Sequence, residues 1–326
     1  MVLWEPVPDP ENAVRIVLVG ASGFLGQNLV RSLAREGHEC IVLTRDAARR
    51  KACRLVPNTH LVAADVNDAA ALEARFEGSD AVVSMAGILN ESLFGDSDFQ
   101  RVHVDLVGSI CKAAGAAGVR RILHVSAINA GEGESQYLAS KGRAEALLLN
   151  SGLDVSIYRP SVIFGPGDTF FNRFAGLLRY APVLPLACPE ARMQPVFVGD
   201  VAAAMCRTLA SHGTLGPVME LGGPRIYTLR ELVRWTAKMM GRKRWVPGLP
   251  DSLSRSQALA MNWVPGRPFT LDNYQSLQLD NVAEPNVLPE LGIEPTPFQS
   301  VAPGYIGLTS RQQRLDQLRR RGRPGR

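Results

Sequence analysis

A glycine-rich turn between an apolar run and a helical pattern constrains the fold of this chain more than any other feature. The run reads VRIVLV and the segment after it reads GASGFLGQNLV, which places Gly20, Gly23 and Gly26 three residues apart. Glycine permits a tight turn and a close approach of a ligand to the backbone, while a helix start offers free N–H groups and a partial positive charge. The segment therefore predicts a strand, a phosphate-binding turn and a helix.

Short apolar runs alternate with helical patterns over the first half of the chain. The runs are VRIVLV, CIVLT, HLVAAD, DAVVSMAG, RILHVS and VSIYR. Continuous runs of this kind are typical of parallel strands that are buried on both faces. We therefore predict an α/β fold, a Rossmann-type doubly wound parallel sheet that binds its ligand at the carboxyl ends of the strands.

Pro-rich and less regular sequence after this half predicts a smaller C-terminal substrate lobe. We expect residues 1–165 to form the nucleotide-binding domain, with its sheet completed by residues 196–223. Residues 166–195 and 224–300 would then build the smaller lobe over the carboxyl edge of the sheet. Residues 301–326 would form a basic C-terminal tail.

Residues near the first two strand ends predict a dinucleotide ligand. The backbone of Ser22, Phe24 and Leu25 should contact the pyrophosphate together with the three glycines. Arg45 follows the second strand, where NAD-specific proteins often place a carboxylate, and it could pair with a 2′-phosphate. This favours NADP(H), although the neighbouring Asp46 keeps NAD(H) possible and Arg45 could also be a solvated side chain.

The next two strand ends add weaker signals. Asp65 and Val66, after the third strand, could border the adenine. Ala86 and Gly87, after the fourth, would let the backbone come close to the cofactor. A glycine after a strand usually only turns the chain, so one such position alone means little. These positions are informative because all of them follow the carboxyl ends of predicted strands.

The segment YLASK predicts a helix that carries Tyr137 and Lys141 on one face, because residues four apart are neighbours on a helix. A phenol with a pKa near 10 is a poor acid at neutral pH, and a nearby ammonium favours its ionised form. The pair could therefore act as a proton donor and its activator. A chance match to this four-residue spacing is common, so the alternative is a tyrosine and a lysine that merely share a helix.

Taken together, GASGFLG, SMAG, HVSA, YLASK, RPSVIFGPGD and QPVFVGDVA resemble the extended and atypical short-chain dehydrogenase/reductase superfamily. The similarity is greatest to the NADPH-binding accessory subunits of respiratory complex I and their bacterial relatives, over residues 14–300. The resemblance implies that Lys141 contacts the nicotinamide ribose, that Tyr137 is the general acid, and that Pro160 lies at the cofactor. Ser126, at the end of the preceding strand, would face either the cofactor or its own backbone. Active members usually have Ser or Thr where Ile128 stands, and loss of such a donor costs about a hundredfold in rate.

Three functions remain open at this point. The resemblance favours a nucleotide-binding accessory or assembly factor of respiratory or quinone metabolism with weak or no turnover. An active NADP(H)-dependent oxidoreductase for a small apolar carbonyl or quinone is the second. A nucleotide-sugar epimerase or dehydratase is the third, and Arg159 and Arg192 could bind a phosphate in that case.

Charge and composition limit the possible cellular locations of the protein and the classes of partner that it could bind. The first residues lack the pattern of a signal peptide and no stretch is long and apolar enough to span a membrane, so we expect a cytoplasmic protein. The five cysteines are scattered, which indicates neither disulfides nor a metal site. The sequence has no basic patch interleaved with aromatic residues, so nucleic acid is a poor candidate partner. The excess positive charge lies in residues 311–326, which hold seven arginines and one aspartate.

Peripheral attachment to a membrane or a membrane-bound complex is a further expectation. Two apolar stretches of the smaller lobe combine arginines and leucines with aromatic residues, namely Phe170, Phe171, Trp245 and Trp263. Aromatic rings and guanidinium groups suit the headgroup region of a bilayer, and a polybasic tail would strengthen the contact. The alternative is that these residues line an apolar pocket or the core of the lobe.

Overall fold

The computed structural model describes residues 13–44, 55–66, 68–89, 98–210, 216–264 and 268–306. The chain divides into two compact units. The larger unit contains the described parts of Met1–Pro160, Val198–Leu221 and Ala283–Glu294. The smaller unit contains those of Ser161–Phe197, Gly222–Val282 and Pro295–Arg326.

A seven-stranded sheet forms the centre of the larger unit, in the order β10-β6-β5-β4-β1-β2-β3, and all its pairings are parallel. Its strands are β1 (Arg15–Val19), β2 (Glu39–Thr44), β3 (Thr59–Ala63), β4 (Ala81–Ser84), β5 (Arg121–Val125), β6 (Asp154–Pro160) and β10 (Val218–Leu221). The chain runs from β1 outward to β3 and then crosses to β4 on the other side of β1. This order confirms the predicted doubly wound fold and creates a switch point between β1 and β4, where such sheets bind ligands.

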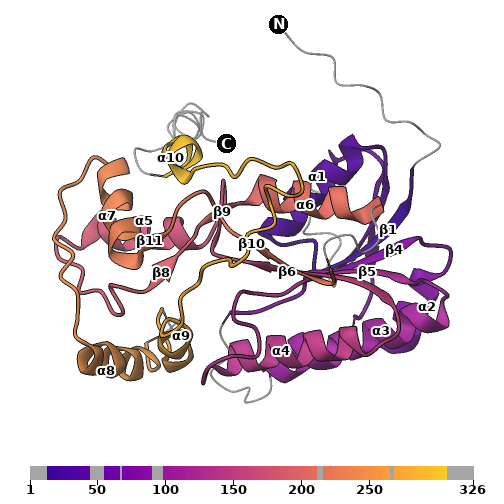
Figure 1. Ribbon diagram of the computed structural model, residues 1–326, viewed down its shortest axis with the longest axis horizontal. Helices are drawn as coiled ribbons and strands as arrows, with labels where there is room; N and C mark the ends of the chain where they lie inside the picture. The colour runs from indigo at the N-terminus through magenta and orange to yellow at the C-terminus, as the bar shows by residue number, and fades with distance from the viewer. Residues whose placement is uncertain are drawn as a thin grey trace, which may run out of the picture. The chain divides into compact units, whose positions relative to one another are not determined.

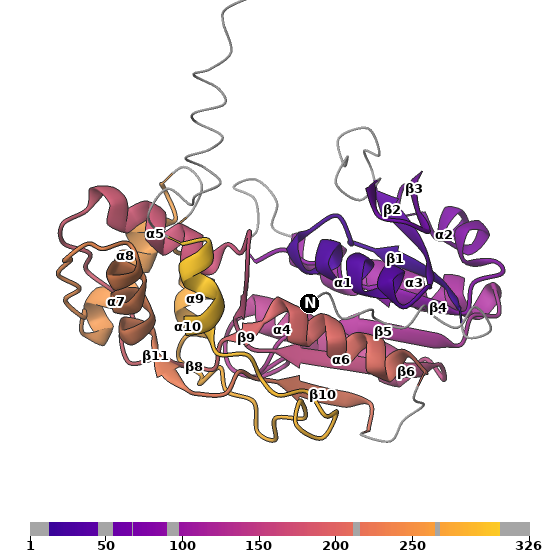
Figure 2. The same ribbon diagram turned by 90° about the horizontal axis from the view of Figure 1, so that it is seen from above.

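Helices cover both faces of this sheet (Figure 1). One face carries α1 (Phe24–Arg35) and α6 (Val198–Ala210), which lie side by side in both views (Figure 2). The other face carries α2 (Ala69–Phe76), α3 (Leu106–Ala116), which follows the π-helical turn Gln100–Asp105, and α4 (Gln136–Leu149). Because both faces are covered, β1 is 0% exposed from Ile16 to Val19, which explains why its sequence is continuously apolar.

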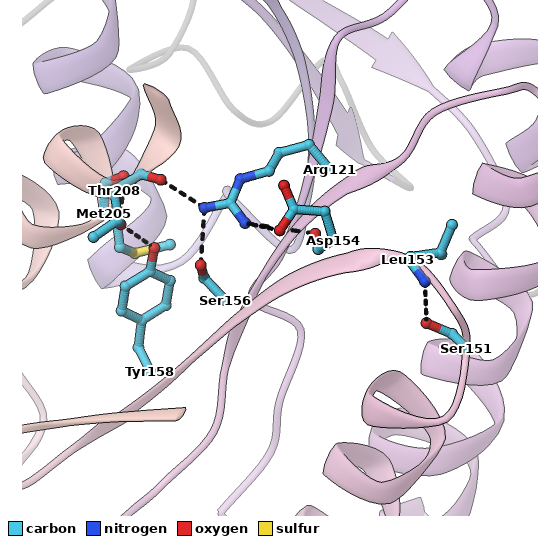
Figure 3. A network of polar contacts seen from close by, with 8 residues as sticks. All are labelled: Arg121, Ser151, Leu153, Asp154, Ser156, Tyr158, Met205 and Thr208. Atoms are coloured by element: carbon cyan, nitrogen blue, oxygen red, sulfur yellow. Dashed lines mark hydrogen bonds and ion pairs between the residues drawn. The ribbon is translucent and has the colours of Figure 1, made fainter. Parts of the chain in front are cut away.

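A buried arginine attaches α6 to the sheet at the amino end of β5, whereas the glycine turn lies at the carboxyl end of β1 (Figure 3). The guanidinium of Arg121, at the start of β5, donates to the Asp154 carboxylate (3.1 Å), to Ser156 Oγ (2.8 Å) and to the carbonyl of Thr208 in the last turn of α6. Tyr158 shares a short hydrogen bond with the Thr208 hydroxyl. These contacts pair a buried charge and bind the end of a helix, while Nε of Arg121 has no hydrogen-bond partner among the described residues. Because the guanidinium already binds a carboxylate, a hydroxyl and a carbonyl, we assign it to stability and not to a ligand site.

Residues 283–294, which the sequence placed in the smaller lobe, belong to the larger unit. They run beside β10, where the Glu284 N–H donates to the Glu220 carboxylate (2.9 Å) and the Val287 N–H donates to the Glu220 carbonyl (3.1 Å). The segment therefore protects the edge of the sheet, since an uncovered edge strand would leave its backbone groups unpaired.

The smaller unit is mainly helical. Its helices are α5 (Phe170–Tyr180), α7 (Leu229–Met239), α8 (Asp251–Met261), α9 (Leu271–Ser276), α10 (Phe298–Val301) and the 3-10 turn Ala302–Gly304. Two short strand pairs join β7 (Ile163–Phe164) to β9 (Val196–Phe197) and β8 (Arg192–Met193) to β11 (Tyr227–Thr228). Aromatic rings fill its core, with Phe164, Phe171 and Phe298 in mutual contact. In the parts of the chain that the structure describes, no helix is both long and apolar enough to cross a bilayer.

Candidate active site

The glycine turn follows β1 and leads into α1. Gly20 has a φ of +85°, and a Cβ atom there would lie 2.5 Å from the backbone nitrogen of Ala86. Both observations require glycine, because other residues rarely adopt a positive φ and the two backbones are nearly in contact. The turn after β1 is thus held against the segment after β4, at the switch point of the sheet.

Gly23 and Gly26 serve different purposes. A Cβ atom on Gly26 would lie 2.2 Å from the Cα of Ala21, so Gly26 is needed for α1 to pack on the turn. A Cβ atom on Gly23 would meet only the Gly20 carbonyl oxygen within 4 Å among the described residues, at 3.7 Å. The fold therefore leaves room beside Gly23, at an N-terminus of α1 that no described side chain caps. A phosphate could approach the first N–H groups of the helix there.

Side chains of α1 hold the other residues of the turn in place. The Gln27 amide donates to the Ser22 carbonyl (3.1 Å), and the Asn28 amide donates to the Phe24 carbonyl (2.9 Å). Phe24 and Leu25 are half-buried in the first turn of the helix. With the carbonyls bound by the protein, the N–H groups of this turn are the backbone groups that could serve an anion.

The residues expected at the adenosine are described only in part. Arg45 and Asp46 lie outside the described residues, and Thr44, the last residue of β2, comes directly before them. Asp65 is exposed after β3, whereas Val66 packs against the core of the sheet. The Ala64 N–H donates to the Thr44 carbonyl (3.2 Å) and keeps the ends of β2 and β3 together.

Gly87 brings the segment after β4 close to α4. A Cβ atom on Gly87 would lie 3.4 Å from the Lys141 ammonium nitrogen and 3.6 Å from Nε2 of His103. The same ammonium donates to the carbonyl of Val125, the last residue of β5 (3.1 Å). The ends of β4 and β5 and one face of α4 therefore meet around Lys141.

Tyr137 and Lys141 lie one turn apart on α4, whose first turn is capped by Ser135. Lys141 is only 5% exposed, and burial lowers its pKa to about 8, although the Glu145 carboxylate opposes this effect. At neutral pH most of the lysine is still charged. The helix places this ammonium and the Tyr137 phenol one turn apart on the same face, where a cation and a proton donor could serve one ligand.

His103, which the sequence analysis missed, connects three parts of this site. Its Nε2 accepts from the Ile88 N–H (3.1 Å), and burial together with the Lys141 ammonium lowers its pKa to about 3, so the ring is neutral. Nδ1 must then carry the proton and donate to Ser140 Oγ (2.8 Å), which donates to the Tyr137 carbonyl (2.7 Å). His103 thus ties the segment after β4 to the helix that carries Tyr137 and Lys141.

Three further buried polar side chains, Ser84, His124 and Ser126, have no hydrogen-bond partner among the described residues. Ser84 and His124 are paired across β4 and β5, and Ser126 follows two residues later. Burial, followed by the positive charge of Lys141, lowers the pKa of His124 well below its ordinary value, so this ring is also neutral. Buried polar groups without partners are costly, and they mark the strand ends as a place where a ligand could supply the missing bonds.

Ile128 is 1% exposed and stands where a catalytic hydroxyl was expected. Its N–H donates to the carbonyl of Pro160 at the end of β6 (3.5 Å), and the Ser126 N–H donates to the Tyr158 carbonyl (2.7 Å). The segment after β5 is therefore fixed to β6 by its backbone. Pro160, expected at the cofactor, contributes its carbonyl to this attachment.

The residues present fit a nicotinamide dinucleotide. The open space beside Gly23 at the start of α1 suits a pyrophosphate. Gly87 and Lys141 meet on the other side of the switch point, and the unpaired Ser126 hydroxyl is close by in the chain. Contacts link Gly20 to Ala86, and Gly87 to Lys141, so these residues form one site.

Comparisons with known proteins agree with this geometry. Residues 20–169 match the sequence profile of an NAD(P)H-binding family. The chain is 35% identical over 242 residues to the ceramide reductase of Caulobacter vibrioides, a match that covers 72% of this chain and 74% of that protein. It is 29% identical to the mitochondrial NADH dehydrogenase (ubiquinone) 1 alpha subcomplex subunit 9 of Rattus norvegicus, over 71% of this chain and 62% of that subunit.

A solved structure shows the same fold. The NADPH-dependent quinone oxidoreductase QOR2 of Escherichia coli, complexed with NADPH, superposes with a TM-score of 0.70 and 20% identity, over 88% of this chain and 98% of that one. An identity this low establishes the fold alone, whereas the ceramide reductase match establishes kinship. The chain belongs to the atypical extended short-chain dehydrogenase/reductases, the NAD(P)H-binding family that includes this ceramide reductase and the complex I accessory subunits.

Proposed function

We propose that the protein is an NAD(P)H-dependent reductase that converts an apolar, lipid-like carbonyl compound to an alcohol, with low turnover, in the cytoplasm. The observation that carries the proposal is the buried ammonium of Lys141, which lies beside Gly87 and one helical turn from Tyr137. The similarity to a ceramide reductase supports an apolar substrate. Arg45, next to the end of β2, supports a preference for NADPH over NADH.

Each residue of the site has a definite task in this reaction. The reduced nicotinamide, when bound, supplies a hydride to the carbonyl carbon. Tyr137 donates its phenolic proton to the carbonyl oxygen, and Lys141 stabilises the phenolate that remains. The Val125 carbonyl holds the ammonium in place (3.1 Å), and the hydrogen bonds of His103 fix α4 to the segment after β4.

Low turnover follows from Ile128. A hydroxyl at this position would help to polarise the carbonyl, and an isoleucine side chain offers no donor. Removal of a positioned donor of this kind lowers a rate by about a hundredfold. The rate should therefore be well below that of relatives that carry Ser or Thr here.

A second candidate function is a nucleotide-binding accessory protein of a respiratory or quinone-synthesis complex, without turnover. The apolar residue at position 128 and the similarity to the rat NADH dehydrogenase subunit favour it. In that case Lys141 and the glycine turn would still bind nucleotide, but Tyr137 would have no substrate.

Chemistry on a nucleotide sugar is less well supported. Arg159, which could have bound a phosphate, donates to both oxygens of the buried Glu145 carboxylate. Arg192 is paired with Asp280 (3.1 Å). Guanidinium groups that are already held by carboxylates are poor candidates for a second anion.

The test is an assay of NADPH oxidation by the purified protein with long-chain ketones, quinones and nucleotide sugars. We expect slow oxidation with an apolar ketone, loss of that activity in Tyr137→Phe, and full activity in the control Tyr180→Phe, whose ring is 82% exposed in the smaller unit. Tight nucleotide binding without oxidation of NADPH by any compound, together with co-purification with a membrane complex, would favour the accessory function instead.

A further inference from the structure

Exposed aromatic side chains gather at the C-terminal end of α5 in the smaller unit. Tyr180 is 82% exposed, Trp245 is 67% exposed and Val183 is 41% exposed. Val183 and Trp245 are bridge partners, and the Trp245 N–H donates to the Pro182 carbonyl (3.1 Å). We call the surface formed by Tyr180, Val183 and Trp245 the Trp245 surface.

Arg244 builds this surface by fastening one chain segment to the end of the helix. Its guanidinium donates to the carbonyl of Leu178 (2.7 Å) and to that of Arg179 (3.4 Å). These bonds satisfy carbonyls that the end of α5 leaves free, and they fix the next residue, Trp245, beside the helix. Trp245 therefore stays 67% exposed although its backbone is held in place.

The surroundings of the Trp245 surface are strongly basic. Arg179, Arg242 and Lys243 are exposed, and none of them forms an ion pair with another described residue. Residues 169–189 and 232–250 together contain seven Lys or Arg residues and no Asp or Glu, and an acidic residue stands directly beside each end of the two ranges, at positions 168, 190, 231 and 251. Several exposed cations without counter-charges attract an anionic partner.

The surface is smaller than the apolar stretches of the sequence suggested. Phe171 is 0% exposed and lies in the core, stacked on Phe298, so its inclusion among the attachment residues was wrong. Phe170 is half-buried and packs on Phe171 and Phe174. Only the tryptophans of the expected set, Trp245 and Trp263, are largely exposed.

We propose that the Trp245 surface docks on an anionic lipid bilayer, with Trp245 and Tyr180 at headgroup depth and the three cations on lipid phosphates. Tryptophan and tyrosine favour this depth, because one part of the ring system is apolar and another is polar. Basic residues next to them add electrostatic attraction to acidic lipids. This contact goes beyond the proposed reductase activity and does not depend on it.

A second copy of the chain fits this surface less well. A two-fold dimer would bring the same patch of each molecule together, and the cations of both copies would then face one another without intervening acids. Like charges at such a contact repel, whereas lipid phosphates would neutralise them.

The test is flotation of the full-length protein with vesicles of phosphatidylcholine, with and without phosphatidylglycerol, at low and high salt. We expect binding only to the acidic vesicles at low salt. Trp245→Ser and the double variant Arg242→Glu/Lys243→Glu should each weaken it, the double variant by about a hundredfold. The control Lys112→Glu/Arg120→Glu, which makes the same change of charge at exposed residues of the larger unit, should bind as the unmodified protein does.

Nucleotide titration of each variant shows whether the larger unit is intact, and it should be unchanged. Binding that survives in Trp245→Ser and in the double variant would overturn the proposal. So would binding that disappears only when residues 311–326 are deleted, since the tail would then be the membrane anchor. Self-association that is lost in Trp245→Ser, without vesicle binding in the unmodified protein, would assign the surface to a second copy.

Discussion

The burial of Lys141 should be measurable as a pH dependence of stability. The lysine is 5% exposed, and burial lowers its pKa from 10.5 to about 8. Above about pH 8 the folded protein releases this proton, while the unfolded chain keeps it until about pH 10.5. Between these values the unfolded state binds more protons, so the free energy of unfolding rises with pH. Below pH 8 the full cost of the buried ammonium is present.

The substitution Lys141→Met isolates this contribution. Methionine has a similar length and does not titrate, and the loss of the bond to the Val125 carbonyl is a cost that does not vary with pH. The stability of the unmodified protein relative to the variant should therefore rise by about 2 kcal/mol between pH 7 and pH 10.

Urea denaturation of both proteins at several pH values gives this difference directly, because other titrating groups cancel. His103 and His124 do not disturb it, since both rings are neutral throughout this range. Lys112→Met, a change at an exposed lysine on α3, should show no such trend. A flat difference for Lys141→Met would refute the buried ammonium and, with it, the assigned role of Lys141.

Three further predictions concern the cofactor and the rate. Gly23→Val should keep the fold and lose nucleotide binding, whereas Gly26→Val should unfold the protein, because a Cβ atom at Gly26 would lie 2.2 Å from the Cα of Ala21. Thermal melts and nucleotide titrations of both variants separate these outcomes. Arg45→Ala should remove most of the preference for NADPH, and equal affinity of the unmodified protein for NADPH and NADH would contradict this. Ile128→Ser should raise the rate of carbonyl reduction while it lowers stability by about 2 to 4 kcal/mol, and an unchanged rate would show that the missing hydroxyl is not the limit.

The centre of the sheet could be predicted because β1, β2, β4 and β5 are buried on both faces, whereas β3, at one edge, has no buried residue. The central strands appear in the sequence as mainly apolar runs, and the helices between the strands complete the pattern. The segment 283–294 could not be placed in this way. It has no regular structure of its own, and its hydrogen bonds to Glu220 and its buried side chains Val287, Leu288 and Ile293 hold it against the larger unit.

The glycine turn was predicted as a unit, but the separate roles of its glycines were not. Spacing alone cannot distinguish a glycine beside open space, as at Gly23, from one on which the protein itself packs, as at Gly26. That distinction depends on what lies within a few ångströms of the missing Cβ atom.

Polar residues inside apolar strands were the signal that the sequence analysis overlooked. Ser84 ends the run AVVS and His124 interrupts RILHV, and both lie at carboxyl ends of buried strands. His103 gave no such signal, because its partners Ile88 and Ser140 are far away in the sequence. In the smaller unit, composition likewise could not separate the buried Phe171 from the exposed Trp245, since both occur in apolar stretches with arginines.

The most direct test of the central claim is transfer of deuterium from the cofactor. The protein is incubated with a long-chain ketone and with NADPH labelled at C4 of the nicotinamide, on either face in turn, and the alcohol is analysed by mass spectrometry. We predict that the label from one face appears on the former carbonyl carbon with the unmodified protein, and that Tyr137→Phe forms almost no labelled alcohol. Absence of label in the product from both faces, in a protein that demonstrably binds NADPH, would contradict the assignment of this chain as a reductase.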